Sequence, residues 1–295
     1  MRRGAALALI VLALAGCGSS PGRHAALAQR PAPGTLGALW RAGGETVGLI
    51  SGTSDYSPGT VRVSFLVIRH NARPVYAPRA RVFVARSRGT RPFERTWASL
   101  EPVGGSGATQ VFVTRLHIPR PGHYWIVAAP TRSRVRALGT LDVNASSASP
   151  ALGSKAFPSR TPTIASTHGD FALLTTRVPP DRGLLRYSIA DSLAAHKPFV
   201  VVFATPKFCT SRTCGPAVDV VDAVRRRFGR TDVRFIHVEV YRRNDPNLGL
   251  NKFMREWHLP SEPWVLLVGS DGRIHAKFEG PVSVPELAAA VRRLS

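Results

Sequence analysis

Hydrophobic and polar residues alternate along the first half of the chain. In residues 60–70 (TVRVSFLVIRH), every second position from Val61 to Val67 is apolar. Similar runs, rich in β-branched and aromatic residues, occupy residues 79–87, 109–118 and 123–130 and are separated by Gly- and Pro-containing turns. This period of two is typical of half-buried strands. It predicts an all-β domain over residues 45–143.

The number of these strands favours a particular β architecture. About seven short strands within about 100 residues are typical of an immunoglobulin-like β-sandwich. Trp97 and Trp125 are interpreted as packing residues. The segment contains no cysteine and no set of catalytic or metal-binding side chains. A binding or spacer module is therefore expected.

The pattern changes after residues 144–166, which are rich in Ser, Pro and Ala and predict a linker. Residues 198–204 (PFVVVFA) are continuously apolar, as in a strand buried on both faces. Further elements are a strand at 232–241, a hairpin over 263–280 that turns at Asp271-Gly272, and helices at 188–197, 216–228, 248–258 and 284–294. From residue 198 onward the predicted order is β, α, β, α, β, β, α.

The N-terminus has the form of an export signal. Arg2 and Arg3 precede an apolar run over residues 7–15, which is too short for a permanent membrane-spanning helix. Residues 14–17 (LAGC) resemble the bacterial lipobox, in which the cysteine, here Cys17, becomes lipidated. An ordinary signal peptide with an incidental cysteine is the alternative. We expect a signal peptide over residues 1–17, a flexible tether over 18–44, and a protein anchored by lipid to the extracytoplasmic face of the cell membrane.

Charge is strongly basic. The chain has 40 Lys and Arg against 18 Asp and Glu, a formal net charge of +22. A cationic, lipid-anchored domain would be attracted to anionic headgroups. The export signal and the absence of a dense basic run argue against nucleic acid as a partner.

Two cysteines remain once Cys17 is assigned to the anchor. Cys209 and Cys214 are separated by four residues in FATPKFCTSRTCGPAVD, in a compartment where disulfides persist. Residues five apart in one helix are separated by about 7.5 Å along its axis, whereas a disulfide needs Cα atoms about 4.4–6.8 Å apart. The pair can close only if Cys209 precedes the helix and Cys214 lies near its first turn. Lys207, Arg212 and the helix N-terminus would then favour the thiolate, and Asp219 would partly oppose them.

Several features around the cysteines occur together in one known superfamily. An apolar strand leads to the aromatic–cysteine pair Phe208-Cys209, and Pro216 falls early in the next helix. Pro263 begins the hairpin, and Gly280 follows its second strand. This combination resembles the thioredoxin-like superfamily over roughly residues 163–295.

The resemblance implies a fold and a site. The fold class is an α/β thioredoxin-like domain (residues 167–295) preceded by an all-β immunoglobulin-like sandwich. The implied catalytic residues are Cys209 and Cys214, as a redox-active disulfide, and Pro263, as a cis proline facing them. Pro260 is a competing candidate for that proline. No cofactor is implied.

The chain also departs from the family pattern. The cysteine spacing is Cys-x4-Cys instead of Cys-x-x-Cys, and Val202 replaces a buried Asp that assists proton transfer in thioredoxins. Two overlays are therefore open. Either Cys209 leads the pair, or residues 213–217 (TCGPA) match the family motif with Cys214 leading and Ala217 in place of the second cysteine.

Three functions remain open. The preferred one is a membrane-anchored extracytoplasmic thiol–disulfide oxidoreductase that acts on protein thiols through Cys209 and Cys214. The second is a non-catalytic interaction lipoprotein with a structural disulfide, although so small a ring stabilises little. The third is copper handling that resembles Sco-type chaperones, with His258 or His275 as further ligands. We expect no metal in the preferred function.

Overall fold

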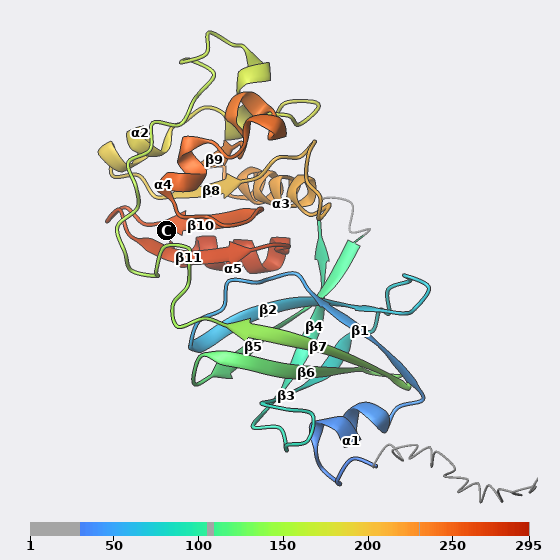
Figure 1. The fold of residues 1–295 in the computed structure, drawn as a ribbon. Helices are drawn as coiled ribbons and strands as arrows, with labels where there is room; N and C mark the ends of the chain where they lie inside the picture. Colours follow the sequence, from blue (N-terminus) through green and yellow to red (C-terminus); the bar gives the residue numbers. More distant parts are fainter. Residues whose placement is uncertain (1–29, 105–108, 230, 295) are drawn as a thin grey trace, which may run out of the picture. The chain divides into compact units, whose positions relative to one another are not determined.

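The N-terminal strands pair into one closed barrel in the computed structural model, which describes residues 30–104, 109–229 and 231–294 (Figure 1). The strands are β1 (Glu45–Ser51), β2 (Gly59–Ile68), β3 (Arg79–Ala85), β4 (Glu94–Val103), β5 (Thr109–Ile118), β6 (Gly122–Pro130) and β7 (Val135–Val143). Their order around the barrel is β1-β2-β5-β4-β3-β6-β7. The barrel closes because β1 pairs antiparallel with β2 on one side and parallel with β7 on the other.

The alternation seen in the sequence places one set of side chains inside the barrel. Val63, Phe65 and Val67 of β2 are buried in its core, where Phe65 stacks on Phe112 of β5 with ring centroids 5.4 Å apart. The two tryptophans lie outside this core. Trp97 lies beneath two arginine side chains of β3, and Trp125 belongs to a small cluster with helix α1 (Leu36–Arg41).

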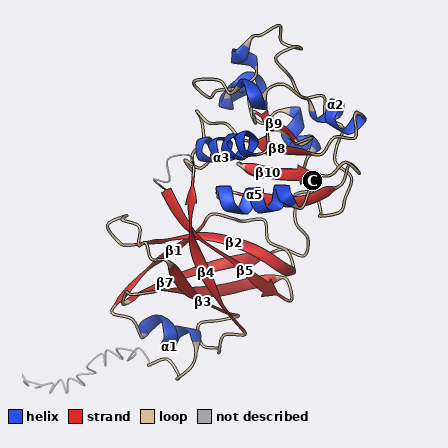
Figure 2. Ribbon diagram, turned by 180° about the vertical axis from the view of Figure 1, so that it is seen from behind, coloured by secondary structure: helices blue, strands red, loops and turns tan. Residues whose placement is uncertain are grey.

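The C-terminal half contains a four-stranded sheet with the order β11-β10-β8-β9. Its strands are β8 (Phe199–Phe203), β9 (Arg234–Val238), β10 (Trp264–Val268) and β11 (Ile274–Glu279). The helices are α2 (Ile189–Ala194), α3 (Cys214–Arg227), α4 (Lys252–Glu256) and α5 (Val284–Arg292). Short 3-10 helices lie at η1 (Phe171–Leu173), η2 (Arg182–Leu184), η3 (Arg242–Asn244) and η4 (Pro246–Leu248). Figure 2 shows the helices flanking this sheet.

The central strand β8 explains why the sheet is covered on both faces. All five of its residues are buried. Val200 and Val202 pack in the cluster that contains residues of α3 and α5, whereas Phe199, Val201 and Phe203 pack in the cluster that contains residues of α2 and α4. A continuously apolar strand is the sequence signature of such a position.

The predicted fold class is wrong. We expected an α/β thioredoxin-like domain after an immunoglobulin-like sandwich, but the chain is mostly β, its seven N-terminal strands close into a barrel, and its helices are few and mostly short. A sandwich and a barrel share the same alternation of buried and exposed residues. The difference lies in the parallel pairing of β1 with β7, which joins strands far apart in sequence.

Residues 144–166, expected to be a linker, make hydrogen bonds along their length. Asp55 accepts hydrogen bonds from the backbone amides of Ala148 and Ser149, and Ala156 N donates to Gly272 O at 2.9 Å. Pro31–Ser295 form one compact unit. The domain boundaries that we assigned within this unit stay a prediction.

The predicted export signal and Cys17 lie outside the described residues. Within the part of the chain that is described, no helix has both the length and the apolar character needed to cross a bilayer.

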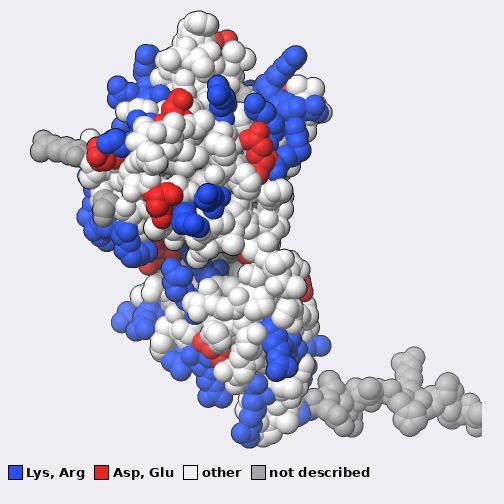
Figure 3. Space-filling view, turned by 90° about the vertical axis from the view of Figure 1, so that its left-hand side faces the viewer, with Lys and Arg blue, Asp and Glu red and all other residues white. Residues whose placement is uncertain are grey.

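Figure 3 shows Lys and Arg spread over the face that it draws, with acidic side chains among them.

Candidate functional site

The two cysteines meet at the junction of a strand and a helix. Cys209 lies in the loop after β8, and Cys214 is the first residue of α3. Their sulfur atoms form a disulfide with a Cα–Cα distance of 5.9 Å. This is the arrangement that the spacing required, with one cysteine before the helix and the other in its first turn.

The two sulfur atoms have different environments. Cys214 is completely buried in the core beneath α3, whereas Cys209 is only partly buried. The backbone amide of Cys214 points at Cys209 Sγ over 3.2 Å, and Ser211 Oγ lies 3.3 Å from the same sulfur. Amide hydrogens at a helix N-terminus favour negative charge. A thiolate formed at Cys209 would therefore be stabilised.

Two charged residues that we expected to influence the thiolate have identified partners. Lys207 is exposed and lies over the ring of Phe208 at 5.2 Å. Asp219, which we expected to oppose a thiolate, is paired with Arg177 at 2.8 Å. Its negative charge is thus largely compensated. Pro216 is the third residue of α3, not its first, because the helix already begins at Cys214.

Pro263 lies directly before β10. The Glu262–Pro263 peptide bond is cis, and the proline is buried. Pro260, the competing candidate, is exposed and is not preceded by a cis bond. The catalytic roles assigned to Cys209, Cys214 and Pro263 stay predictions.

One buried carboxyl group, Glu239, and one half-buried carboxyl group, Glu262, lie where the cysteine loop begins. Glu262 Oε2 accepts a hydrogen bond from the backbone amide of Thr205 at 2.7 Å, just past Ala204, the residue that follows β8. Glu239 Oε1 accepts from the amide and the hydroxyl of Thr176 at 2.6 and 2.8 Å. The amide of Lys207 in turn donates to the Thr176 hydroxyl at 3.2 Å. This carboxyl pair, Glu239 and Glu262, thus holds the first residues of the loop.

The environment of Glu262 raises its pKa. Burial, and next the nearby charge of Glu239, raise the pKa of Glu262 to about 7, against the favourable hydrogen bond from Thr205. Burial and Glu262 together raise the pKa of Tyr241. Glu239 Oε2 is buried without a hydrogen-bond partner among the described residues. Beside the disulfide loop, the protein therefore holds a carboxyl group that titrates near neutral pH.

We did not single out the carboxyl pair from the sequence, although a signal was present. Glu239 interrupts the apolar run of residues 235–240 (FIHVEV), where an acidic residue is unusual. Glu262 directly precedes Pro263. Neither observation indicates that the two side chains lie close together.

The histidines considered as copper ligands have other partners. His275 Nε2 lies 3.1 Å from Asp271 Oδ1, and the ring of His258 packs edge-on against Phe157. Across the described ranges, no three His, Cys, Asp or Glu side chains lie together in a way that could hold a metal ion. The residues beside the disulfide do not fit a copper site.

Comparisons with known proteins give little support for any particular function of this chain. No family model matches the chain, and no curated protein matches it. Among solved structures, it is similar to a thiol:disulfide interchange protein, a thioredoxin family protein from Chlorobium tepidum TLS, with 15% identity and a TM-score of 0.30. The match covers 37% of this chain and 85% of that one. The likeness is partial and weak, so function has to be inferred from the residues themselves.

Proposed function

We propose that this chain is a membrane-anchored, extracytoplasmic thiol–disulfide oxidoreductase that acts on protein thiols. The observation that carries the proposal is the asymmetry of the disulfide. Cys209 is partly exposed, and its sulfur accepts a hydrogen bond from the backbone amide of Cys214, the first residue of α3. Cys214 itself is fully buried. Exchange needs one accessible sulfur that a thiolate can attack and one that leaves and later returns.

The chemistry follows from this asymmetry. A client thiolate attacks Cys209 Sγ, a bond forms between the two sulfurs, and the Cys209–Cys214 bond breaks. Cys214 leaves with the electron pair and takes up a proton. A second client thiolate then attacks the client sulfur of the mixed disulfide, which releases Cys209 as a thiolate. The client has been oxidised to a disulfide and the protein reduced to a dithiol, and the same steps in reverse reduce a client.

The environment of Cys209 supports its role as the attacking group in that reverse direction. The Cys214 amide would stabilise the Cys209 thiolate, and the positive charge of Lys207 is nearby in sequence. A larger thiolate fraction speeds attack at neutral pH. This assigns the leading position to Cys209, and it disfavours the overlay in which Cys214 is the nucleophile.

The site also supports the choice of a protein client. Cys209 lies on an exposed loop, with Thr210, Ser211 and Arg212 all exposed beside it. A surface loop can be approached by a folded or unfolded polypeptide. Lipid anchoring through Cys17 would hold this loop near exported proteins at the membrane.

Trapping of mixed disulfides tests the function. The full chain carrying C214S, expressed in an exporting bacterial host, should form covalent adducts with client proteins that reducing agent releases, while C209S should form none. The purified wild-type chain should catalyse insulin reduction by dithiothreitol, and the C209S/C214S double variant serves as the control. If neither single variant forms adducts and the wild-type disulfide resists dithiothreitol in the folded state, the disulfide is structural and the proposal fails.

A further inference from the structure

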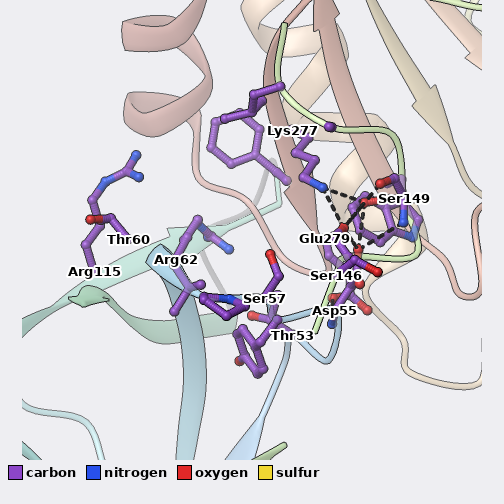
Figure 4. Close-up of a pocket in the computed structure, with 18 of the residues that line it drawn as sticks. Thr53, Asp55, Ser57, Thr60, Arg62, Arg115, Ser146, Ser149, Lys277 and Glu279 are labelled. Atoms are coloured by element: carbon purple, nitrogen blue, oxygen red, sulfur yellow. Dashed lines mark hydrogen bonds between the residues drawn. The ribbon is translucent and has the colours of Figure 1, made fainter. Parts of the chain in front are cut away.

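A second candidate site lies apart from the disulfide. A cavity of about 600 Å³ is bounded by β2, β5 and β11 together with residues of the 145–152 segment. None of its lining residues belongs to the cysteine loop. Figure 4 shows the polar side chains that surround it. Its volume falls within the range of about 300–1,000 Å³ that is typical of small-molecule sites.

The two carboxylates in the cavity wall each accept four hydrogen bonds from the protein. Asp55 accepts from the hydroxyls of Ser147 and Ser149 and from the amides of Ala148 and Ser149. Glu279 accepts from the amides of Ser54 and Asp55 and from the hydroxyls of Ser54 and Ser261. An ionised carboxylate offers about four lone-pair sites. Glu279 accepts two bonds on each oxygen, whereas Asp55 Oδ1 accepts only from the Ala148 amide, so these two groups keep little acceptor capacity for a ligand.

Lys277, a cation in the cavity wall, retains an unused hydrogen-bond donor. Lys277 Nζ donates to Ser147 Oγ and Ser149 Oγ at 2.7 and 2.8 Å, which leaves one of its three N–H groups unused. It forms no ion pair within 4.0 Å with any residue that the structure describes. Burial lowers the pKa of Lys277, against the nearby charges of Asp55 and Glu279. This ammonium group lacks a contacting anion.

Two arginines face each other across neighbouring strands. Arg62 of β2 is the direct register partner of Arg115 of β5. Like charges in this position destabilise a sheet. Glu286 compensates only one of them, because it pairs with Arg62 at 2.8 Å. Arg115 is exposed, and its guanidinium makes no hydrogen bond or ion pair with a residue that the structure describes.

We propose that this cavity binds a small oxyanion-bearing molecule, with a phosphate or carboxylate group at Arg115 and a further acceptor atom directed at Lys277. The carboxylates of the wall are largely engaged by protein donors, while Lys277 and Arg115 retain unused donors, so the complementary ligand is rich in acceptors. Arg115 offers a planar fork of N–H groups that matches a phosphate or a carboxylate. The proposal is independent of the chemistry at the disulfide.

The orientation follows from where the carboxylates lie. In Figure 4, Asp55 and Glu279 are near Lys277, while Arg115 lies at the opposite end of the group with Arg62 between them. Negative charge near Lys277 would repel the acid group of a ligand. The acid group is therefore placed at Arg115, and an uncharged acceptor, such as a hydroxyl or carbonyl oxygen, at Lys277.

Calorimetric titration of the full chain with tripolyphosphate tests the site. We expect saturable binding of one molecule per chain, weakened about tenfold in R115Q, the loss typical of one charged hydrogen-bonding partner. R115Q should fold normally because Arg115 is exposed. R95Q is the matched control, since Arg95 is also an exposed barrel arginine but does not line the cavity. It should bind as the wild type does.

A second arm distinguishes a free ligand from a lipid headgroup. Sedimentation with vesicles of phosphatidylglycerol, compared with vesicles of phosphatidylcholine, uses the same variants. If R115Q loses binding to the phosphatidylglycerol vesicles but R95Q does not, and tripolyphosphate binding is unaffected, the site binds the phosphate of a lipid. If R115Q selectively loses binding to tripolyphosphate, the site binds a free ligand. If neither probe binds, or if R95Q loses as much affinity as R115Q, attraction to the general positive charge explains the result and the site is refuted.

Discussion

Glu262 accepts a hydrogen bond from the backbone amide of Thr205 at 2.7 Å, so a carboxyl group that precedes β10 fixes the chain that leaves β8. The contact joins the segment that follows β8 to the segment that precedes β10, where the cysteine loop begins, and Glu262 lies near Glu239. Loss of the Glu262 proton places a negative charge beside Glu239 at the base of the loop. Protonation of Glu262 is therefore linked to stability.

The first prediction concerns pH. Because the pKa of Glu262 is raised from 4.5 to about 7, the folded protein holds a proton that the unfolded chain releases between these values. The free energy of unfolding should therefore fall as pH rises through this window. In E262Q the decline should be smaller by on the order of 1–2 kcal/mol between about pH 5 and pH 8, a value reduced because Glu262 is partly solvated.

Urea unfolding at a series of pH values measures this difference. Glutamine can still accept the hydrogen bond from Thr205 but cannot ionise, so the comparison isolates the charge. E94Q, at the first position of β4, is the control and should keep the wild-type slope. Parallel curves for E262Q and the wild type would show that Glu262 does not titrate in this range.

The second prediction concerns the unequal accessibility of the cysteines. After reduction, iodoacetamide should modify Cys209 at least about tenfold faster than Cys214, because Cys214 is completely buried and Cys209 is not. Mass spectrometry of the peptides that contain each cysteine gives the two rates. In about 8 M urea the difference between the two modification rates should disappear, because it depends on the folded structure. Faster modification of Cys214 in the folded protein would reverse the assigned roles.

The third prediction concerns the ion pair between Arg62 and Glu286. The side chain of Arg62 is only 8% exposed, and Glu286 binds it through both carboxylate oxygens. E286Q should lower the free energy of unfolding by about 2 kcal/mol, because it leaves a buried guanidinium without its counter-charge. Denaturant unfolding of E286Q, R62M and the double variant measures the coupling. A coupling below about 0.5 kcal/mol would mean that the pair contributes little.

The fourth prediction concerns the anchor. Cys17 follows the apolar run directly, which is the basis for assigning it a lipid. C17S should move the protein from the membrane fraction to the soluble extracytoplasmic fraction, as shown by fractionation and immunoblotting. C209S is the matched control, since it removes a cysteine outside the signal and should stay with the membrane. An unchanged distribution of C17S would show that lipidation at this residue does not hold the protein there.

Local structure could be predicted from the sequence wherever the pattern of neighbouring residues alone determines it. The apolar run at 198–204 contains β8, and the Asp271-Gly272 turn lies between β10 and β11. The cysteine spacing also required one position in the loop and one in the helix. These features depend on neighbouring residues and on the geometry of a single turn or helix.

Features that depend on residues far apart in sequence could not be predicted in this way. The alternation of buried and exposed residues in β2 is compatible with a sandwich or a barrel. Only the parallel pairing of β1 with β7, which begins at Glu45 and Val135, decides between the two architectures. The proximity of Glu239 and Glu262 likewise arises because β9 and the start of β10 both flank β8. Glu239 is locally unusual as an acid in an apolar run, but nothing in either local pattern indicates that it lies close to Glu262.

Closure of the barrel has a consequence for self-association. A barrel leaves no unpaired strand edge, whereas the open four-stranded sheet ends at β11 and β9. The β11 edge is occupied by the chain itself, because Ile274 N donates to Ser154 O and Gly153 N donates to Ile274 O. A nick or deletion near residues 153–156 would uncover this edge, and aggregation by strand addition would then be expected to begin at β11.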